Sequence, residues 1–289
     1  MKNNYVVSAN QNAWCPVNRE MTYEERLRAF SLYVKGLYGK PVVLFLQEIM
    51  AGKGQKYLAV LREEFPEYEL ITNPAFDYHE HYRSIMNVTL IRKDALKGYS
   101  VDGAAGYLGD GAIGCSEGEV TDYSGGGATG CSMEALEIVL PNRIVHVTAN
   151  LNGNIVELYN VHICQTVNFK NKPAWFIDQR KRAAKAQWDY LLKEAESKRD
   201  EAVIIGGDMQ ENIISGGHLC KLARLGYKSL KSRTATVSNE FFGREHSHID
   251  TILFSKKADE KLNPVTVFVD KSKVGTLSDH AILIAACVG

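Results

Sequence analysis

The stretch 202–212 constrains the fold more than any other part of the chain. Within it, 203–205 is a short run of β-branched residues, and a run of this length and composition predicts a buried strand. Gly206 and Gly207 follow, and glycine lets the backbone turn tightly and approach a ligand closely. We therefore expect the glycines to end the strand and Asp208 to stand at its exit, where open α/β sheets place their chemistry. An ordinary turn is the alternative interpretation.

The composition is that of a globular protein with a sizeable core. The chain has 289 residues, of which 45% are hydrophobic and 24% charged, both ordinary values. This length suits one large α/β domain or two small ones. The 34 basic residues balance the 34 acidic ones, so the totals do not imply strong non-specific attraction to nucleic acid. A local basic face remains compatible with them.

The cysteines and the apolar segments indicate the cellular compartment in which the protein is expected. None of the six cysteines forms a C-x-x-C pair, which gives a zinc site no support. The even count would allow three disulfides, but in a chain this long we expect reduced core thiols. No segment resembles a signal peptide, and none approaches the roughly 20 apolar residues of a membrane span. We expect a soluble cytoplasmic protein without a membrane span.

The periodicity of the apolar residues predicts alternating strands and helices in one domain. We expect strands at 5–10, 41–48, 68–72, 86–92, 135–140, 144–151, 155–162, 248–255, 265–269 and 277–288, and helices at 22–38, 54–65, 175–197 and 218–225. Thr22 and Glu25 fit a capping box, and Asn152-Gly153 is a strong hairpin signal. No repeat and no linker composition divides residues 1–289.

Two further segments have alternative interpretations. The Gly-rich region at about 98–130 is expected to be a flexible surface excursion, with a mobile loop over the site as the alternative. Arg180, Lys181, Arg182 and Lys185 lie early in the long helix expected at 175–197. A solvated face explains these charges, and contact with phosphate is the alternative.

Polar residues stand beside the apolar runs at several places along the chain. They are Asn10, Glu48, Asn160, His162, Asp208, Gln210, His248, Asp250, Asp279 and His280. Each alone has an ordinary explanation as a cap, a turn or a partly buried side chain. Together they predict that these side chains converge on one site, provided that the strand ends lie at the same edge of the fold.

Oxygen ligands without cysteine indicate a hard cation, Mg²⁺ or Mn²⁺. Glu48 is the best candidate ligand, with Asn10 beside it, and such a metal would polarise a phosphoryl oxygen. His280 is a candidate base or stabiliser of phosphate charge, with Asp250 as the carboxylate that orients its ring.

Six motifs resemble the endonuclease/exonuclease/phosphatase superfamily, which includes DNase I and exonuclease III. In the family order, they are Ser8-Ala-Asn10, Leu46-Gln-Glu-Ile49, Tyr159-Asn-Val-His162, Gly207-Asp-Met-Gln210, His248-Ile-Asp250 and Ser278-Asp-His280. The resemblance spans nearly the whole chain. It implies a four-layer α/β sandwich, in which two mixed β-sheets pack face to face with helices outside.

The resemblance also implies roles for individual residues. Glu48 would bind the metal, with Asn10 and Asp279 near it. His280, paired with Asp250, would face the phosphate, and Asp208 would position or activate the attacking water. His162 would contact the scissile phosphate or help the leaving group. Substrate contacts are expected from Asn160, Gln210, Asn87 and His248, of which Asn87 comes only from a loosely similar strand at 86–90.

Three departures from the family pattern stand out. Gln210 replaces the asparagine of G-D-x-N and is one methylene longer, and a displacement near 1 Å matters at a catalytic site. His248 stands where the family has a basic residue, which would add sensitivity to pH. The tyrosine motif of the abasic-site enzymes is missing where Asn160 and His162 stand, which disfavours abasic repair. A separate His79-Glu80-His81 cluster is expected to be a surface loop.

The sequence thus predicts a Mg²⁺-dependent phosphodiesterase that cleaves nucleic acid by in-line attack of water. The alternatives are a phosphomonoesterase or lipid phosphodiesterase on the same fold, and a catalytically impaired binding protein, which Gln210 motivates. The expected partner is nucleic acid or another phosphoester substrate, and no protein partner is predicted.

Overall fold

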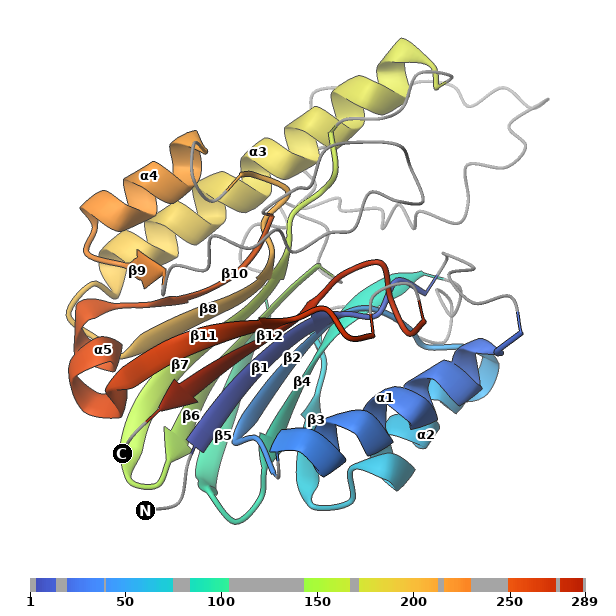
Figure 1. Cartoon of the computed structure of the whole chain (residues 1–289). Coiled ribbons are helices and arrows are strands. Elements are labelled where there is room, and N and C mark those ends of the chain that lie inside the picture. Colours follow the sequence, from blue (N-terminus) through green and yellow to red (C-terminus); the bar gives the residue numbers. More distant parts are fainter. Residues whose placement is uncertain are drawn as a thin grey trace.

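The computed structural model describes residues 4–13, 20–38, 40–74, 84–103, 143–166, 172–212, 216–229, 249–273 and 276–287. Within these residues, two six-stranded sheets pack face to face (Figure 1). The first sheet has the spatial order β11 (Pro264–Asp270), β12 (Ile282–Cys287), β1 (Asn4–Asn10), β2 (Val43–Met50), β4 (Ile85–Arg92) and β3 (Tyr68–Ile71). The second has the order β5 (Leu96–Gly103), β6 (Ile144–Leu151), β7 (Asn154–His162), β8 (Val203–Asp208), β10 (Asp250–Phe254) and β9 (Lys228–Ser229).

Helices cover the outer faces of both sheets. They are α1 (Tyr23–Tyr38), the short 3₁₀ turn η1 (Lys53–Gln55), α2 (Lys56–Glu64), α3 (Ala174–Ser197), α4 (Gly217–Arg224) and α5 (Lys256–Leu262). Figure 1 shows α1 and α2 along the first sheet, and α3 and α4 along the second. The buried apolar residues accordingly form three layers, one between the sheets and one beneath each pair of helices. The predicted four-layer α/β sandwich is confirmed.

Local signals explain how several elements begin and turn. The Thr22 backbone N–H donates to Glu25 Oε2 at 2.7 Å, and the Glu25 N–H donates to Thr22 Oγ1 at 3.2 Å, which completes the predicted capping box at the start of α1. The β6–β7 hairpin turns at Asn152 and Gly153, whose φ angles are 53° and 93°. Positive φ at both central residues is what a tight hairpin turn requires.

The glycines of β8 differ from the sequence prediction. The strand does not end at Gly206 and Gly207 but continues to Asp208. A Cβ on Gly206 would lie 2.3 Å from the ring of Phe45 in the opposite sheet, and one on Gly207 would lie 1.8 Å from the Val161 carbonyl oxygen. The glycines therefore allow close packing within and between the sheets, because any larger residue would push a neighbour away.

Some other predicted elements differ from the structure, and some lie outside the described residues. Strand β5 occupies 96–103, so the expected irregular excursion does not begin at 98. The remainder of that region, the predicted strand at 135–140 and the His79–His81 loop lie outside the described residues. The short elements α5 and β9 were not predicted. At α5, Ser255 Oγ accepts the Ala258 N–H at 3.2 Å and so caps the start of the helix. No described helix is long and apolar enough to cross a bilayer.

Strand direction brings the polar motifs to one edge of the sandwich. β1 runs parallel to β2, and β7 runs parallel to β8. The C-terminal ends of these four strands therefore lie at this edge of the sandwich. β12 is antiparallel to β1, and β10 is antiparallel to β8, so both present their N-terminal ends at the same edge. Segments far apart in sequence thereby deliver their polar residues to one place.

Candidate active site

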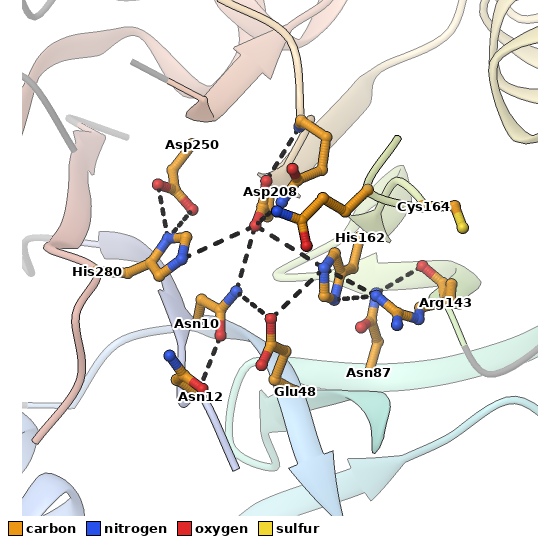
Figure 2. Close-up of polar contacts among 12 residues, drawn as sticks. Asn10, Asn12, Glu48, Asn87, Arg143, His162, Cys164, Asp208, Asp250 and His280 are labelled. Carbon is orange, nitrogen blue, oxygen red and sulfur yellow. Dashed lines mark hydrogen bonds and ion pairs between the residues drawn. The ribbon is translucent and has the colours of Figure 1, made fainter. Parts of the chain in front are cut away.

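Asn10 joins the two sheets at this edge. Its side-chain amide donates to Glu48 Oε1 at 3.1 Å and to Asp208 Oδ2 at 3.3 Å. Figure 2 shows Asn10, Glu48, Asp208, His162 and His280 directed toward one common region. The convergence expected from the sequence is therefore present for these five side chains.

Glu48 reaches the site because β2 is irregular there. The pairing of β2 with β4 shifts register between Leu46 and Ile49, and Glu48 has a φ of 54°. A bulge of this kind re-aims a side chain and is common beside active sites, and a non-glycine residue at positive φ is strained. The side chain is only 17% exposed. Burial raises its pKa, against the opposing effects of His280 and Arg143.

His162 and Arg143 form the side of the site next to Glu48. His162 Nε2 lies 3.6 Å from Glu48 Oε1 and 3.8 Å from Asp208 Oδ2. Arg143 Nη1 lies 2.8 Å from either ring nitrogen of His162 (Figure 2). Burial, reinforced by the Arg143 charge, lowers the pKa of His162 well below its ordinary value. His162 is therefore a neutral imidazole held beside a buried guanidinium.

His280 has the opposite electrostatic character. Its Nδ1 lies 3.0 and 2.9 Å from the two carboxylate oxygens of Asp250, and its Nε2 lies 3.9 Å from Asp279 Oδ1 and 4.0 Å from Asp208 Oδ2. Burial disfavours the charged ring, but Asp250, Asp279 and Asp208 outweigh it and raise the pKa of His280 well above its ordinary value. The ring is therefore an imidazolium among carboxylates.

Asp208 is the buried centre of the cluster. Burial, with repulsion from Asp250, raises the pKa of Asp208 to about 7, against the opposing effect of His280. Its carboxylate accepts the Gln210 backbone N–H at 3.0 Å and the Gln210 side-chain amide at 2.8 Å. Gln210 thus lies beside this cluster, and its longer side chain reaches back to Asp208.

Asp279 is held by Asn12, which lies outside the six motifs and was not predicted from the sequence. Asn12 Nδ2 donates to Asp279 Oδ1 at 2.6 Å, and the Asn12 backbone N–H donates to Asn10 Oδ1 at 2.9 Å. Arg26 in turn donates to the carbonyl oxygens of Asn12 and Leu277, at 3.2 Å each. Asn12 follows Asn10 by two residues, a spacing typical of side-chain turns, and this was the one available signal. Arg143 lies in no recognisable motif, so nothing in the sequence pointed to it.

Asn160 and Asn87 do not fit the predicted substrate-binding role. Both are fully buried. Asn160 donates to the carbonyl oxygens of Leu46 and Val88, at 3.2 and 2.9 Å, and accepts from Gln47 Nε2 at 2.8 Å. It therefore bridges the two sheets. Asn87 Nδ2 donates to the carbonyl oxygens of Arg143 and Asn160, at 2.7 and 3.0 Å. The predicted residue His248 lies outside the described residues.

The donor set of the site fits a hard divalent cation. Ligand atoms of Glu48, His162 and Asp208 lie within 4.8 Å of one another, and those of Asp208, Asp250 and His280 form a second such group. Burial raises the pKa of both Glu48 and Asp208, and repulsion from neighbouring carboxylates, Asp279 for Glu48 and Asp250 and Glu48 for Asp208, raises each pKa further. A cation would relieve that repulsion, and carboxylate and amide oxygens are the ligands that Mg²⁺ and Mn²⁺ prefer.

Comparison with solved structures identifies the fold. D. rerio TDP2 in complex with a single-strand DNA product is 17% identical, with both chains covered completely and a TM-score of 0.62. An endonuclease/exonuclease/phosphatase family protein from Bacteroides thetaiotaomicron is 13% identical, with 99% of this chain and 97% of that chain covered and a TM-score of 0.63. The corresponding protein from Bacteroides vulgatus is 13% identical, with 100% and 99% covered and a TM-score of 0.61. The sequence itself matches no family model and no curated protein.

These similarities define the class of fold: two mixed sheets face to face, with outer helices and a polar cluster at one edge. The chain has the fold of the endonuclease/exonuclease/phosphatase superfamily. The resemblance stated from the six motifs is therefore confirmed at the level of the fold.

Proposed function

We propose that this protein is a metal-dependent hydrolase of phosphate esters, most specifically a phosphodiesterase of the nuclease type. The observation that carries the proposal is the convergence of Glu48, Asp208, His162 and the His280–Asp250 pair at one edge of the sandwich. This set combines oxygen donors for a cation with groups for handling protons and phosphate charge.

Glu48, with Asn10 and Asp279 near it, would hold Mg²⁺ or Mn²⁺. When bound, the metal supplies Lewis-acid polarisation of a phosphoryl oxygen and offsets the charge that develops on it. Glu48 suits this role because its strained backbone and its hydrogen bond from Asn10 fix its direction. Asn12 does the same for Asp279.

Asp208 is the candidate for positioning and activating the attacking water. Its pKa of about 7 lies where a general base is effective at neutral pH. The two hydrogen bonds from Gln210 hold the carboxylate in place. Orientation of this kind is a large part of what an enzyme contributes to a reaction between water and a bound ester.

His280 would bind and neutralise the phosphate. An imidazolium held by Asp250 is a preorganised donor for the oxygens of the transferring group. His162 faces the same region as a neutral imidazole backed by Arg143, which suits contact with the scissile phosphate or assistance to the leaving group. Arg143 adds a buried positive charge that the motifs did not predict.

A nucleic-acid substrate is the favoured class. D. rerio TDP2, which shares the fold, was crystallised with a single-strand DNA product. The zero net charge of this chain argues mildly against an extended DNA-binding groove, but a small nuclease needs only a few phosphate contacts. His248 is retained as a proposed substrate contact. A small phosphomonoester or a phospholipid would be recognised by the same central chemistry.

A hydrolysis screen tests this function. Supercoiled plasmid, single-stranded DNA, RNA, phosphomonoesters and phospholipids would be incubated with Mg²⁺, Mn²⁺ or EDTA, with Glu48→Ala run beside the wild type. Metal-dependent cleavage of nucleic acid that is lost in Glu48→Ala is the expected result. Turnover of a small phosphoester alone would move the protein to the phosphatase or lipid branch. No turnover of any substrate would contradict the proposal and favour a binding role.

The activity of Gln210→Asn tests whether Gln210 impairs catalysis. Increased activity would mean that the longer side chain limits turnover. Decreased activity would mean that the site is built around the hydrogen bond from Gln210 to Asp208.

A further inference from the structure

A pocket of about 260 Å³ lies next to the catalytic cluster, between α3, α4 and the ends of β7 and β8. Gln210 belongs to both places: it lines the pocket, and its side chain donates to Asp208 at 2.8 Å. Cys164, two residues after His162, also lines the pocket. A ligand in the pocket would therefore contact Gln210, the residue that holds the Asp208 carboxylate.

One wall of the pocket is cationic. Lys181 and Lys185 line it from successive turns of α3, because residues four apart share a helix face. Lys185 forms an ion pair with Asp189 at 2.5 Å. Among the described residues, none forms an ion pair with Lys181, so its charge is available to an anionic ligand.

The acidic side chain in the pocket is already engaged. Glu211 accepts the backbone N–H groups of His218 and Leu219, each at 3.0 Å, where α4 begins. It also lies 3.1 Å from His218 Nδ1. A carboxylate is stabilised at a helix N-terminus, so the negative charge of Glu211 is balanced locally and does not cancel that of Lys181.

The α4 side of the pocket offers a flat ring. His218 stacks on Trp188 with ring centroids 4.7 Å apart and planes at 8°. Trp188 is only 4% exposed, whereas the side chain of His218 is 35% exposed. Because Trp188 covers one face of His218, the remaining exposure comes from the other face and the ring edge. Glu211 and Trp188 together hold this ring in one orientation.

We propose that the pocket is a subsite for one nucleotide unit of the substrate, whose base stacks on His218 and whose phosphate is bound by Lys181. A flat ring beside a cation is the combination that single-stranded nucleic acids require, because every base has a face that stacks and every linkage carries a charge. The volume of about 260 Å³ is of the order of one nucleotide. This inference rests on the proposed function, since it names the substrate class of the same site.

Binding of two small probes tests the subsite. Adenosine 5′-monophosphate and ribose 5-phosphate carry the same phosphate, but only the first has a base. Calorimetric titration of the full chain with Mg²⁺ present should show tighter binding of adenosine 5′-monophosphate in the wild type. His218→Ala should remove most of that preference, a loss of about fivefold or more in affinity for the nucleotide, as expected from stacking. Lys181→Ala should weaken binding of both probes.

Arg182→Ala is the matched control. Arg182 is exposed on the same helix and carries the same charge, but it does not line the pocket. It should bind both probes as the wild type does. Equal affinity of the wild type for the two probes, or unchanged binding in Lys181→Ala and His218→Ala, would overturn the proposal. So would an equal loss in Arg182→Ala, which would indicate diffuse attraction to the whole helix.

Failure of the subsite can be distinguished from failure of the proposed function. Hydrolysis of bis(4-nitrophenyl) phosphate by the wild type, with Glu48→Ala as the inactive control, reports on the catalytic cluster without a nucleotide. If no phosphoester is hydrolysed, the proposed function fails, whereas the titrations still decide whether the pocket binds a nucleotide. If hydrolysis is intact but the probes do not distinguish the variants, the subsite fails and the proposed function stands.

Discussion

Both carboxylate oxygens of Asp250 lie against one ring nitrogen of His280, at 3.0 and 2.9 Å, although the two residues are 30 positions apart in sequence. The contact crosses between the two sheets, because Asp250 begins β10 of one sheet and His280 precedes β12 of the other. It fixes the ring orientation and favours the imidazolium form.

Asp250→Asn is expected to lower kcat by about 10²–10⁴-fold, the range associated with positioned acid–base groups. The loss should fall mainly on kcat, because Asp250 keeps His280 charged and oriented toward the charge that develops in the transition state. Steady-state kinetics with a nucleic-acid substrate, with circular dichroism as a check of the fold, would measure this. A selective rise in KM at unchanged kcat would contradict the positioning role.

Glu48→Gln is expected to reduce activity by about 10²-fold or more, because under the proposed function it removes the carboxylate that would hold the cation. The melting temperature should stay the same or rise, because the variant no longer buries a carboxylate that repels Asp208 and Asp279. Calorimetric titration with Mn²⁺ should show weaker binding. Glu260→Gln, at an exposed position on α5, is the control. Wild-type affinity for Mn²⁺ in Glu48→Gln would remove Glu48 from the metal site.

Asn160→Ala tests whether this residue is a bridge between sheets. It would leave Gln47 Nε2 and two backbone carbonyl oxygens without their partner. An unsatisfied buried group costs about 1–3 kcal/mol, so the free energy of unfolding should fall by about that amount or more. Urea denaturation would measure the loss. Unchanged stability combined with a raised KM would restore the substrate-binding interpretation.

Glu157→Gln should make stability less dependent on acid pH. Glu157 lies outside the site. Its Oε2 lies 2.5 Å from His146 Nε2 and accepts hydrogen bonds from Thr148 Oγ1 and Lys198 Nζ, each at 2.9 Å. Burial opposes ionisation, but these partners outweigh it and lower the pKa from 4.5 to about 2. The ionised form therefore contributes about 3 kcal/mol above pH 4.5, which is lost as the pH falls toward 2.

At pH 7, Glu157→Gln should unfold at a lower urea concentration than the wild type, and the difference should shrink as the pH falls through that window. Glu196→Gln, at an exposed position on α3, should follow the wild type at every pH. A constant difference between the wild type and Glu157→Gln from pH 7 to pH 3 would be evidence against this ion-pair network.

Gly206→Ala should destabilise the fold by about 1–3 kcal/mol, the usual cost of overpacking a core, because the new Cβ meets the ring of Phe45. Combining it with Phe45→Leu should cost less than the sum of the two single changes. Gly98→Ala, where a Cβ meets nothing within 4 Å, is the control. Additive losses in the double variant would show that the two residues do not compete for space.

The sequence by itself determined the elements and the motif residues. Periodicity, the capping box at Thr22 and the Asn152-Gly153 turn are local signals, and they place most strands and helices correctly. The six motifs predicted the superfamily fold, and those within the described residues supplied Asn10, Glu48, Asp208, Asp250 and His280, which the structure brings to one edge.

Only the tertiary structure decided which polar residues face that edge and which are enclosed. Asn160 and His162 stand two apart on β7, yet one is enclosed between the sheets and the other borders the site. Arg143, Asn12 and the pocket lined by Lys181 and His218 became visible only when separate segments were placed side by side. The physical reason is that burial and charge coupling depend on neighbours in space, and local sequence patterns do not specify those neighbours.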